Sequence, residues 1–150
     1  MATTTATAMR TAFETIILAL TPAGTAHGRA AFQKASPHRS WDQRSKSDID
    51  REFTIDDIKL GEVLEFGINT EYDYNATMMV TIGHAITGDA NTGIGRREDD
   101  VMQIAEALHK KTNYPSGVHL VIPNGSSSTV ENEKFWITII SFRLKFTRSV

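Results

Sequence analysis

The sequence contains no cysteine, only four prolines among 150 residues, and no apolar run near the ~20 residues that a membrane-spanning helix needs. The lack of cysteine excludes disulfides, thiol nucleophiles, iron–sulfur clusters and thiolate zinc sites. Neither sign of charge dominates, because 16 Lys and Arg oppose 18 Asp and Glu for a net charge of −2. A dedicated nucleic-acid-binding domain would be visibly basic, so this balance argues against one.

The composition that remains is that of a globular protein. Hydrophobic residues make up 40% of the chain and charged residues 23%. A chain of this length can bury roughly 68–70% of its unfolded surface, which is enough for one core. We therefore expect a single domain over residues 1–150.

The first periodic segment predicts an amphipathic helix. Its apolar residues recur at i, i+4, i+7, i+8 and i+11: Met9, Phe13, Ile16, Ile17 and Leu20. Pro22 and Gly24 then end the helix. A cleaved secretory signal is the alternative, since Arg10 precedes an apolar stretch, but Glu14 inside that stretch favours the helix.

Alternation and short apolar runs predict the strands. They fall at 29–34, 51–56, 63–68, 76–86, 118–122 and 134–147. We expect turns or loops at 57–61, 88–95 and 123–128, and an exposed loop at 35–49. The Met- and Val-rich strand at 76–86 is expected to be buried on both faces. The last strand would span about 45 Å at ~3.3 Å per residue, so we expect its far end to need a second sheet or another subunit.

A second helix is predicted over 98–111. Its apolar residues share one face: Val101, Ile104, Ala105 and Leu108. Acidic residues Glu98, Asp99 and Asp100 open this helix and lysines close it, as the helix dipole favours. The fold class is therefore α+β, with a mostly antiparallel sheet, two packed helices and a long C-terminal strand.

No pattern in the sequence assembles a catalytic, cofactor-binding or metal site. The five histidines include no i, i+4 pair, and no H-E-x-x-H occurs. His84 and His119 are expected to be ordinary strand residues. The glycines from Gly88 to Gly95 lack both the Lys-Ser/Thr of a phosphate loop and the third glycine of a dinucleotide fingerprint. We expect no enzyme activity and no cofactor.

Charge is segregated along the chain. Basic residues gather within 27–46, and acidic residues gather within 48–73. Trp41 lies among Arg39, Arg44 and Lys46, a combination that suits either nucleic-acid stacking or a protein contact, and we favour the protein contact. An assembly subunit with two oppositely charged faces would show this segregation of charge, and ordinary solvated loops would show it too.

Four stretches together resemble the tail terminator proteins of long-tailed bacteriophages, also called tail completion or minor tail proteins. They are MRTAFETIILAL near the N-terminus, REFTI at 51–55, the block at 76–111 with its RREDDV helix start, and NYPSGVHLV at 113–121 before the long final strand. The resemblance spans roughly the whole chain and rests on layout rather than on a strict motif. The basic loop at 35–49 has no counterpart in that layout.

The resemblance implies a structural virion protein at the head–tail interface, assembled in the host cytoplasm. Such proteins form a hexameric ring that caps the tail tube, stops its elongation and joins the head-side neck or stopper protein. DNA passes through the lumen without specific binding, and no membrane is involved. Alternatives are a head-completion, stopper or tail tube protein, or a non-viral binding module or small hydrolase whose site residues lie far apart in sequence.

Two residue sets are candidates for contacts. The end of the long strand is expected to contribute Phe142, Leu144 and Phe146 to the interface between subunits. The basic loop is expected to contact the tail tube or the neck through Arg39, Trp41, Arg44 and Lys46.

Overall fold

A computed structural model describes residues 5–22, 29–35, 49–66, 71–86 and 90–149. Its elements are α1 (Ala6–Leu18), β1 (Gln33–Lys34), β2 (Glu52–Ile55), β3 (Lys59–Phe66), β4 (Glu71–Ala85), α3 (Ala90–His109), the 3₁₀ turn η2 (Lys111–Asn113), β5 (Val118–Glu131) and β6 (Phe135–Ser149). The predicted α+β class is confirmed. Neither described helix is long and apolar enough to cross a membrane.

Helix α1 begins after an N-cap at Thr5. The Thr5 hydroxyl accepts a hydrogen bond from the Ala8 amide at 3.0 Å, which satisfies one of the free N–H groups of the first turn. Met9, Phe13 and Ile17 are buried, so the apolar stripe faces the protein interior. The helix ends at Leu18, slightly before the predicted stop.

The sheet has six strands in the order β1-β2-β4-β6-β5, with β3 also paired to β4. Among the strands that the structure describes, only the short β1–β2 pair is parallel. β6 pairs with β4 from Glu71↔Ser149 to Ala85↔Phe135 and with β5 along its other edge. The prediction that the last strand needs a second sheet or another subunit is therefore wrong, because its own sheet supplies both neighbours.

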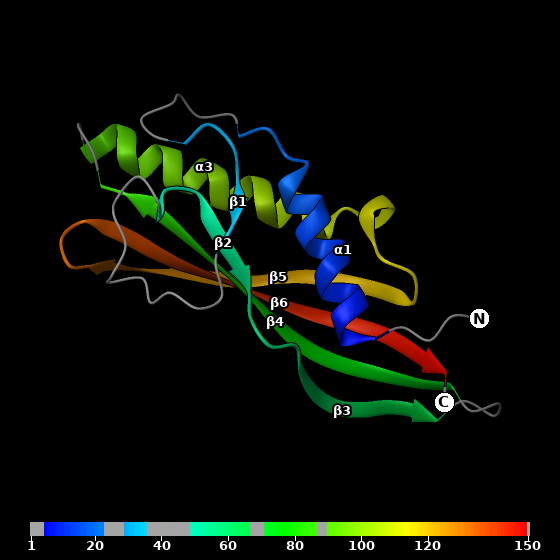
Figure 1. Cartoon of the computed structure of the whole chain (residues 1–150). Coiled ribbons are helices and arrows are strands. Elements are labelled where there is room, and N and C mark those ends of the chain that lie inside the picture. The colour runs from blue at the N-terminus through cyan, green and yellow to red at the C-terminus, as the bar shows by residue number, and fades with distance from the viewer. Residues whose placement is uncertain (1–4, 23–28, 36–48, 67–70, 87–89, 150) are drawn as a thin grey trace.

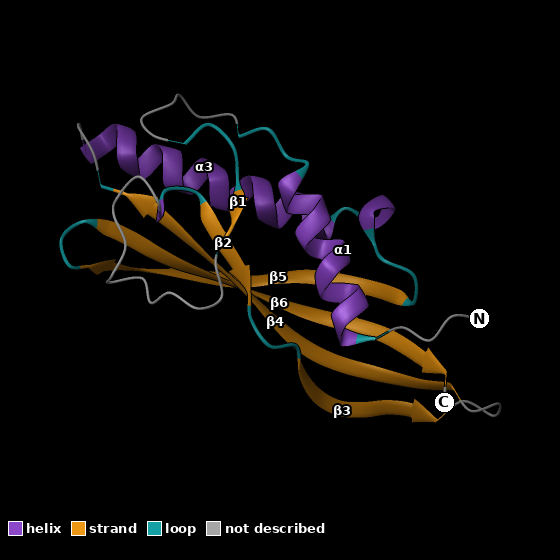
Figure 2. Ribbon diagram, in the orientation of Figure 1, coloured by secondary structure: helices purple, strands orange, loops and turns teal. Residues whose placement is uncertain are grey.

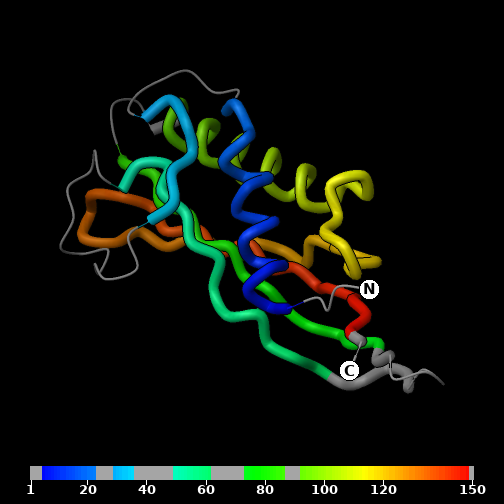
Figure 3. The backbone as a smooth tube through the Cα atoms, turned by 45° about the vertical axis from the view of Figure 1, so that its right-hand side comes forward, coloured from blue at the N-terminus to red at the C-terminus, as the bar shows by residue number. Residues whose placement is uncertain are grey.

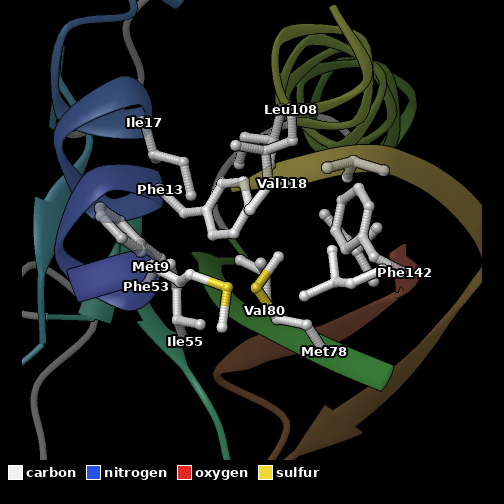
Figure 4. Close-up of a cluster of buried hydrophobic side chains, with 14 of the residues drawn as sticks. Met9, Phe13, Ile17, Phe53, Ile55, Met78, Val80, Leu108, Val118 and Phe142 are labelled. Atoms are coloured by element: carbon white, nitrogen blue, oxygen red, sulfur yellow. The ribbon is translucent and has the colours of Figure 1, made fainter. Parts of the chain in front are cut away.

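The molecule has two layers. Both α1 and α3 lie on the same side of the sheet, and the views in Figure 1, Figure 2 and Figure 3 agree on this. The core lies between the layers, where Met9, Phe13 and Ile17 point toward Met78 and Val80 (Figure 4). The opposite face of the sheet is not covered by either described helix.

The predicted boundaries of α3 and β5 are wrong, and the burial predicted for β4 holds for part of the strand. Helix α3 starts at Ala90, so much of the predicted loop at 88–95 is helical despite its glycines. β5 runs through Pro123 and the three serines to Glu131, with an irregular register between Pro123 and Ser126 that accommodates the proline. The predicted burial of β4 on both faces is confirmed from Val80 to Ala85, whereas its earlier part is buried on one face only, since Met78 is fully buried and its neighbour Met79 is 37% exposed.

Candidate functional site

The residues proposed from sequence for subunit contact lie in the chain's own core. Phe142, Leu144 and Phe146 are each at most 2% exposed, under the helices. Alternation explains this, since their β6 neighbours Arg143 and Lys145 point to the opposite face and are exposed. The expectation that these apolar residues present an interface surface is thus corrected.

The other proposed set falls outside the described residues. Arg39, Trp41, Arg44 and Lys46 all belong to 36–48. Of the predicted exposed loop at 35–49, the structure describes its two end residues, Ala35 and Ile49, and both are buried.

Sequence reasoning missed a cluster of buried charges. Its members come from the two residues before β2, from β4 and from α3, and none is more than 6% exposed: Asp50, Arg51, His84, Arg96 and Asp100. We call this set the buried charge cluster. Charged groups are rarely this deep in a protein unless they are paired.

Asp100 on α3 joins the helix to the sheet. Arg51 donates to its carboxylate through Nε to Oδ2 at 2.7 Å and through Nη2 to Oδ1 at 3.0 Å, a bidentate pair. His84 of β4 lies against the same carboxylate, with Nε2 2.7 Å from Oδ2. One carboxylate therefore binds a residue just before β2 and a residue of β4.

Asp50 makes the second pair of the cluster. Arg96, one helical turn before Asp100 on α3, donates to both Asp50 oxygens at 2.6 and 2.7 Å. The backbone amides of Ala85 and Arg29 donate to the same carboxylate at 3.1 and 2.8 Å. Asp50 thus ties the end of β4 and the segment before β1 to α3.

Arg51 holds an unusual backbone conformation that makes this arrangement possible. Its φ is 59°, in the left-handed region that non-glycine residues seldom adopt. In an extended strand Asp50 and Arg51 would point to opposite faces, whereas here both side chains bond to residues of α3. The Arg51 amide donates to Gly83 at 2.8 Å and its carbonyl accepts from Gln33 at 3.0 Å, which fixes this conformation.

Both carboxylates of the cluster are held in their charged form. Burial alone raises the pKa of Asp50, but hydrogen bonds from Arg96, Ala85 and Arg29 outweigh it and leave this pKa below its ordinary value of 3.8. Burial likewise raises the pKa of Asp100, and hydrogen bonds from His84 and Arg51 bring it below 3.8. Near neutral pH the two carboxylates therefore stand as anions opposite the guanidinium groups of Arg51 and Arg96.

The buried charge cluster is placed to hold the fold together rather than to meet a substrate. His84 and Asp100 resemble the base and orienting acid of a hydrolase, but they are 1% and 0% exposed. Two cavities described below are lined by other residues. The sequence did hold a signal for this cluster, because Arg96 and Asp100 are spaced i, i+4. That spacing puts both residues on one face of a helix, provided that the helix begins before Arg96.

The most accessible special surface is the sheet face opposite the helices, here called the open face. Strand register puts Lys59, Thr77, Arg143 and Ile122 in one row across β3, β4, β6 and β5. Asn75, Lys145 and Leu120 form the next row. The intervening Ala76, Leu144 and Val121 are buried toward the helices, which confirms that these rows point outward.

The open face combines cations with apolar side chains. Large hydrophobic residues on it are each more than a third exposed: Met79, Leu120, Ile122 and Ile139. A depression of about 310 Å³ lies among Leu120, Ile122, Arg143 and Lys145. No salt bridge involves Lys59, Arg143 or Lys145 within the described ranges. Apolar surface gathered beside free charges is typical of protein-binding sites.

A second, polar cavity of about 390 Å³ lies between α3 and the outer part of the β5–β6 hairpin. Arg97, Glu98 and Met102 line its helical side, and Ser126 and Ser128 line the strand side. The Ser128 and Thr138 hydroxyls are 2.8 Å apart and hydrogen-bonded to each other. Across the part of the chain with assigned placement, no three His, Asp or Glu side chains are grouped to hold a metal ion.

Comparison with known proteins leaves the family open. No protein-family model and no curated protein matches the chain.

Proposed function

We propose that this chain is a tail terminator of a long-tailed bacteriophage, a subunit that acts by assembling into a hexameric ring and not by catalysis. The observation that carries the assembly role is the open face, where Leu120 and Ile122 lie beside Arg143 and Lys145 without cover from the described helices. Exposed apolar surface of this kind is costly for a protein that works alone. The phage-tail assignment rests on the four stretches of resemblance.

In this proposal the ring caps the tail tube, ends its growth and joins the head-side neck protein at the head–tail interface of the virion. DNA crosses the lumen without specific contacts. A chain with a net charge of −2 supports that role, because strong cationic contacts to phosphate would retard the passing duplex.

Native mass spectrometry and negative-stain electron microscopy of the purified chain test this function. We expect hexamers and single-layer rings with six-fold symmetry. A stable dimer as the only assembly would contradict the proposal. Rings that stack on themselves into long tubes would instead indicate a tail tube protein.

A further inference from the structure

We infer that neighbouring copies of this chain join head to tail, with the outer flank of α3 on one copy seated on the open face of the next. This inference rests on the proposed ring and names the two surfaces that make it. A contact between two different surfaces of the same chain is the kind that closes into a ring when its rotation allows.

The flank of α3 offers an acidic stripe with an apolar centre. Glu98, Met102 and Glu106 follow one another at i, i+4 and i+8, so they share one side of the helix. All three are exposed, Met102 by 59%. No salt bridge engages either glutamate within the described ranges. We call these three residues the α3 stripe.

The open face is complementary to the α3 stripe in charge and in apolar content. Lys59, Arg143 and Lys145 supply cations, and Leu120 and Ile122 supply the wall of a depression that an exposed methionine can enter. Asp73, the next outward-facing residue along β4, adds one carboxylate to this face, and the Thr147 hydroxyl donates to it at 2.5 Å without neutralising its charge.

The spacing of the charges also matches. Lys59 and Arg143 are separated by two strand intervals, or about 10 Å. Glu98 and Glu106 are separated by eight helical residues, or about 12 Å. The flexible ends of lysine and arginine span the difference. A second copy is favoured over DNA as the occupant, because Leu120 and Ile122 would gain nothing from a phosphate backbone.

Within one chain the two surfaces cannot meet. α3 packs on one side of the sheet and the open face is the other side (Figure 1, Figure 3). Any contact between Met102 and Thr77, which lies on β4 in the row between Lys59 and Arg143, must therefore come from two copies.

A charge swap tests the inference. Variant one carries Arg143→Glu and Lys145→Glu, and variant two carries Glu98→Lys and Glu106→Lys. Each alone places like charges together, so we expect the apparent dissociation constant to rise about a hundredfold or more and the ring to be lost. An equimolar mixture restores opposite charges at every contact, and because six is even, alternating copies close the ring again.

Native mass spectrometry measures the loss of the ring in each variant alone and its return in the mixture. Circular dichroism shows that each variant is folded. If wild-type rings form but either variant alone assembles equally well, or the mixture stays monomeric, the inference is overturned and the proposed function stands. If the wild type forms no rings at all, both fail. Binding of variant one and wild type to a DNA duplex, followed by fluorescence anisotropy, checks the alternative occupant: loss of tight wild-type binding in variant one would overturn the inference in favour of DNA.

The natural lack of cysteine allows a direct second test. A chain with Thr77→Cys and Met102→Cys is oxidised with copper phenanthroline and run on a non-reducing gel. We expect a ladder of covalent multimers up to the ring, and only monomers from either single variant. Dimers from Thr77→Cys alone would show a symmetric face-to-face contact and overturn the inference.

Discussion

At the residue scale, Asp100 is the member of the buried charge cluster whose replacement we expect to lower the stability most. It holds both Arg51 and His84 and is fully buried. A buried ion pair adds little net stability over an apolar pair, but removing one partner leaves the other charge buried and uncompensated.

We therefore predict that Asp100→Asn lowers the free energy of unfolding by about 3–5 kcal/mol. Urea denaturation followed by circular dichroism measures this change. The matched control is Asp99→Asn, the exposed neighbour on the same helix, which should change stability by no more than about 0.5 kcal/mol. Equal effects of the two substitutions would contradict the structure of the cluster.

The same carboxylates predict how stability depends on pH. Asp50 and Asp100 have folded-state pKa values below 3.8, so the folded state binds fewer protons than the unfolded state in acid. Their contribution is complete above the unfolded pKa of about 4 and is lost as the pH falls through the folded pKa, with a slope of up to about 1.4 kcal/mol per pH unit for each carboxylate.

Urea denaturation between pH 6 and 2.5 checks this slope. Asp100→Asn should give a shallower profile than the wild type, because it removes one of the two groups. A wild-type stability that stays level below pH 4 would contradict the prediction.

At the element scale, α3 starts earlier than its composition indicates, and Gly95 tests that start. A Cβ added there meets no heavy atom within 4 Å, and the residue lies inside the helix. We predict that Gly95→Ala stabilises the protein by about 0.5–1 kcal/mol, because alanine loses less backbone entropy on forming a helix.

Thermal unfolding measures this gain, expected as a rise of about 1–4 °C in Tm. Gly125→Ala is the opposing control, since Gly125 has a φ of +93° and an alanine there strains the backbone. If Gly95→Ala lowers Tm, the segment before residue 96 is not helical.

Sequence patterns predicted elements whose residues repeat with a clear period. The stripe of α1 and the alternation of β2 and of the second half of β6 are local signals, and they led to the correct α+β class. The early start of α3 and the continuation of β5 past Pro123 were missed because glycine and proline were taken to end a helix or a strand. They do so only when packing elsewhere in the fold does not offset their local cost.

The candidate sites were harder to predict because they depend on pairing between distant segments. The buried charge cluster joins Asp50 to Arg96 and Arg51 to Asp100, and nothing local in the sequence indicates which charged residues become buried. The open face was missed because the sequence does not say on which side of β6 the helices pack. That choice buried Phe142 and exposed Arg143.

At the scale of the whole molecule, both layers share one core, so a charge placed between them should undo the fold rather than only the ring. Phe142 and Leu144 lie in that core, with Phe142 among the helix-facing residues of Figure 4. Two buried carboxylates would each cost more than about 4 kcal/mol. Together they would cancel much or all of the free energy of unfolding, which is about 5–15 kcal/mol for a domain of this kind.

We predict that the double variant Phe142→Asp, Leu144→Asp loses its near-ultraviolet circular dichroism and its dispersed amide resonances at neutral pH. The control variant Arg143→Glu, Lys145→Glu changes the alternate residues of the same strand and should keep both signals while losing the ring. These results would show that the helix-facing side of β6 is needed for folding and that its opposite side is needed for assembly. A folded, monomeric Phe142→Asp, Leu144→Asp protein would show instead that these residues face another subunit and that the core described here is wrong.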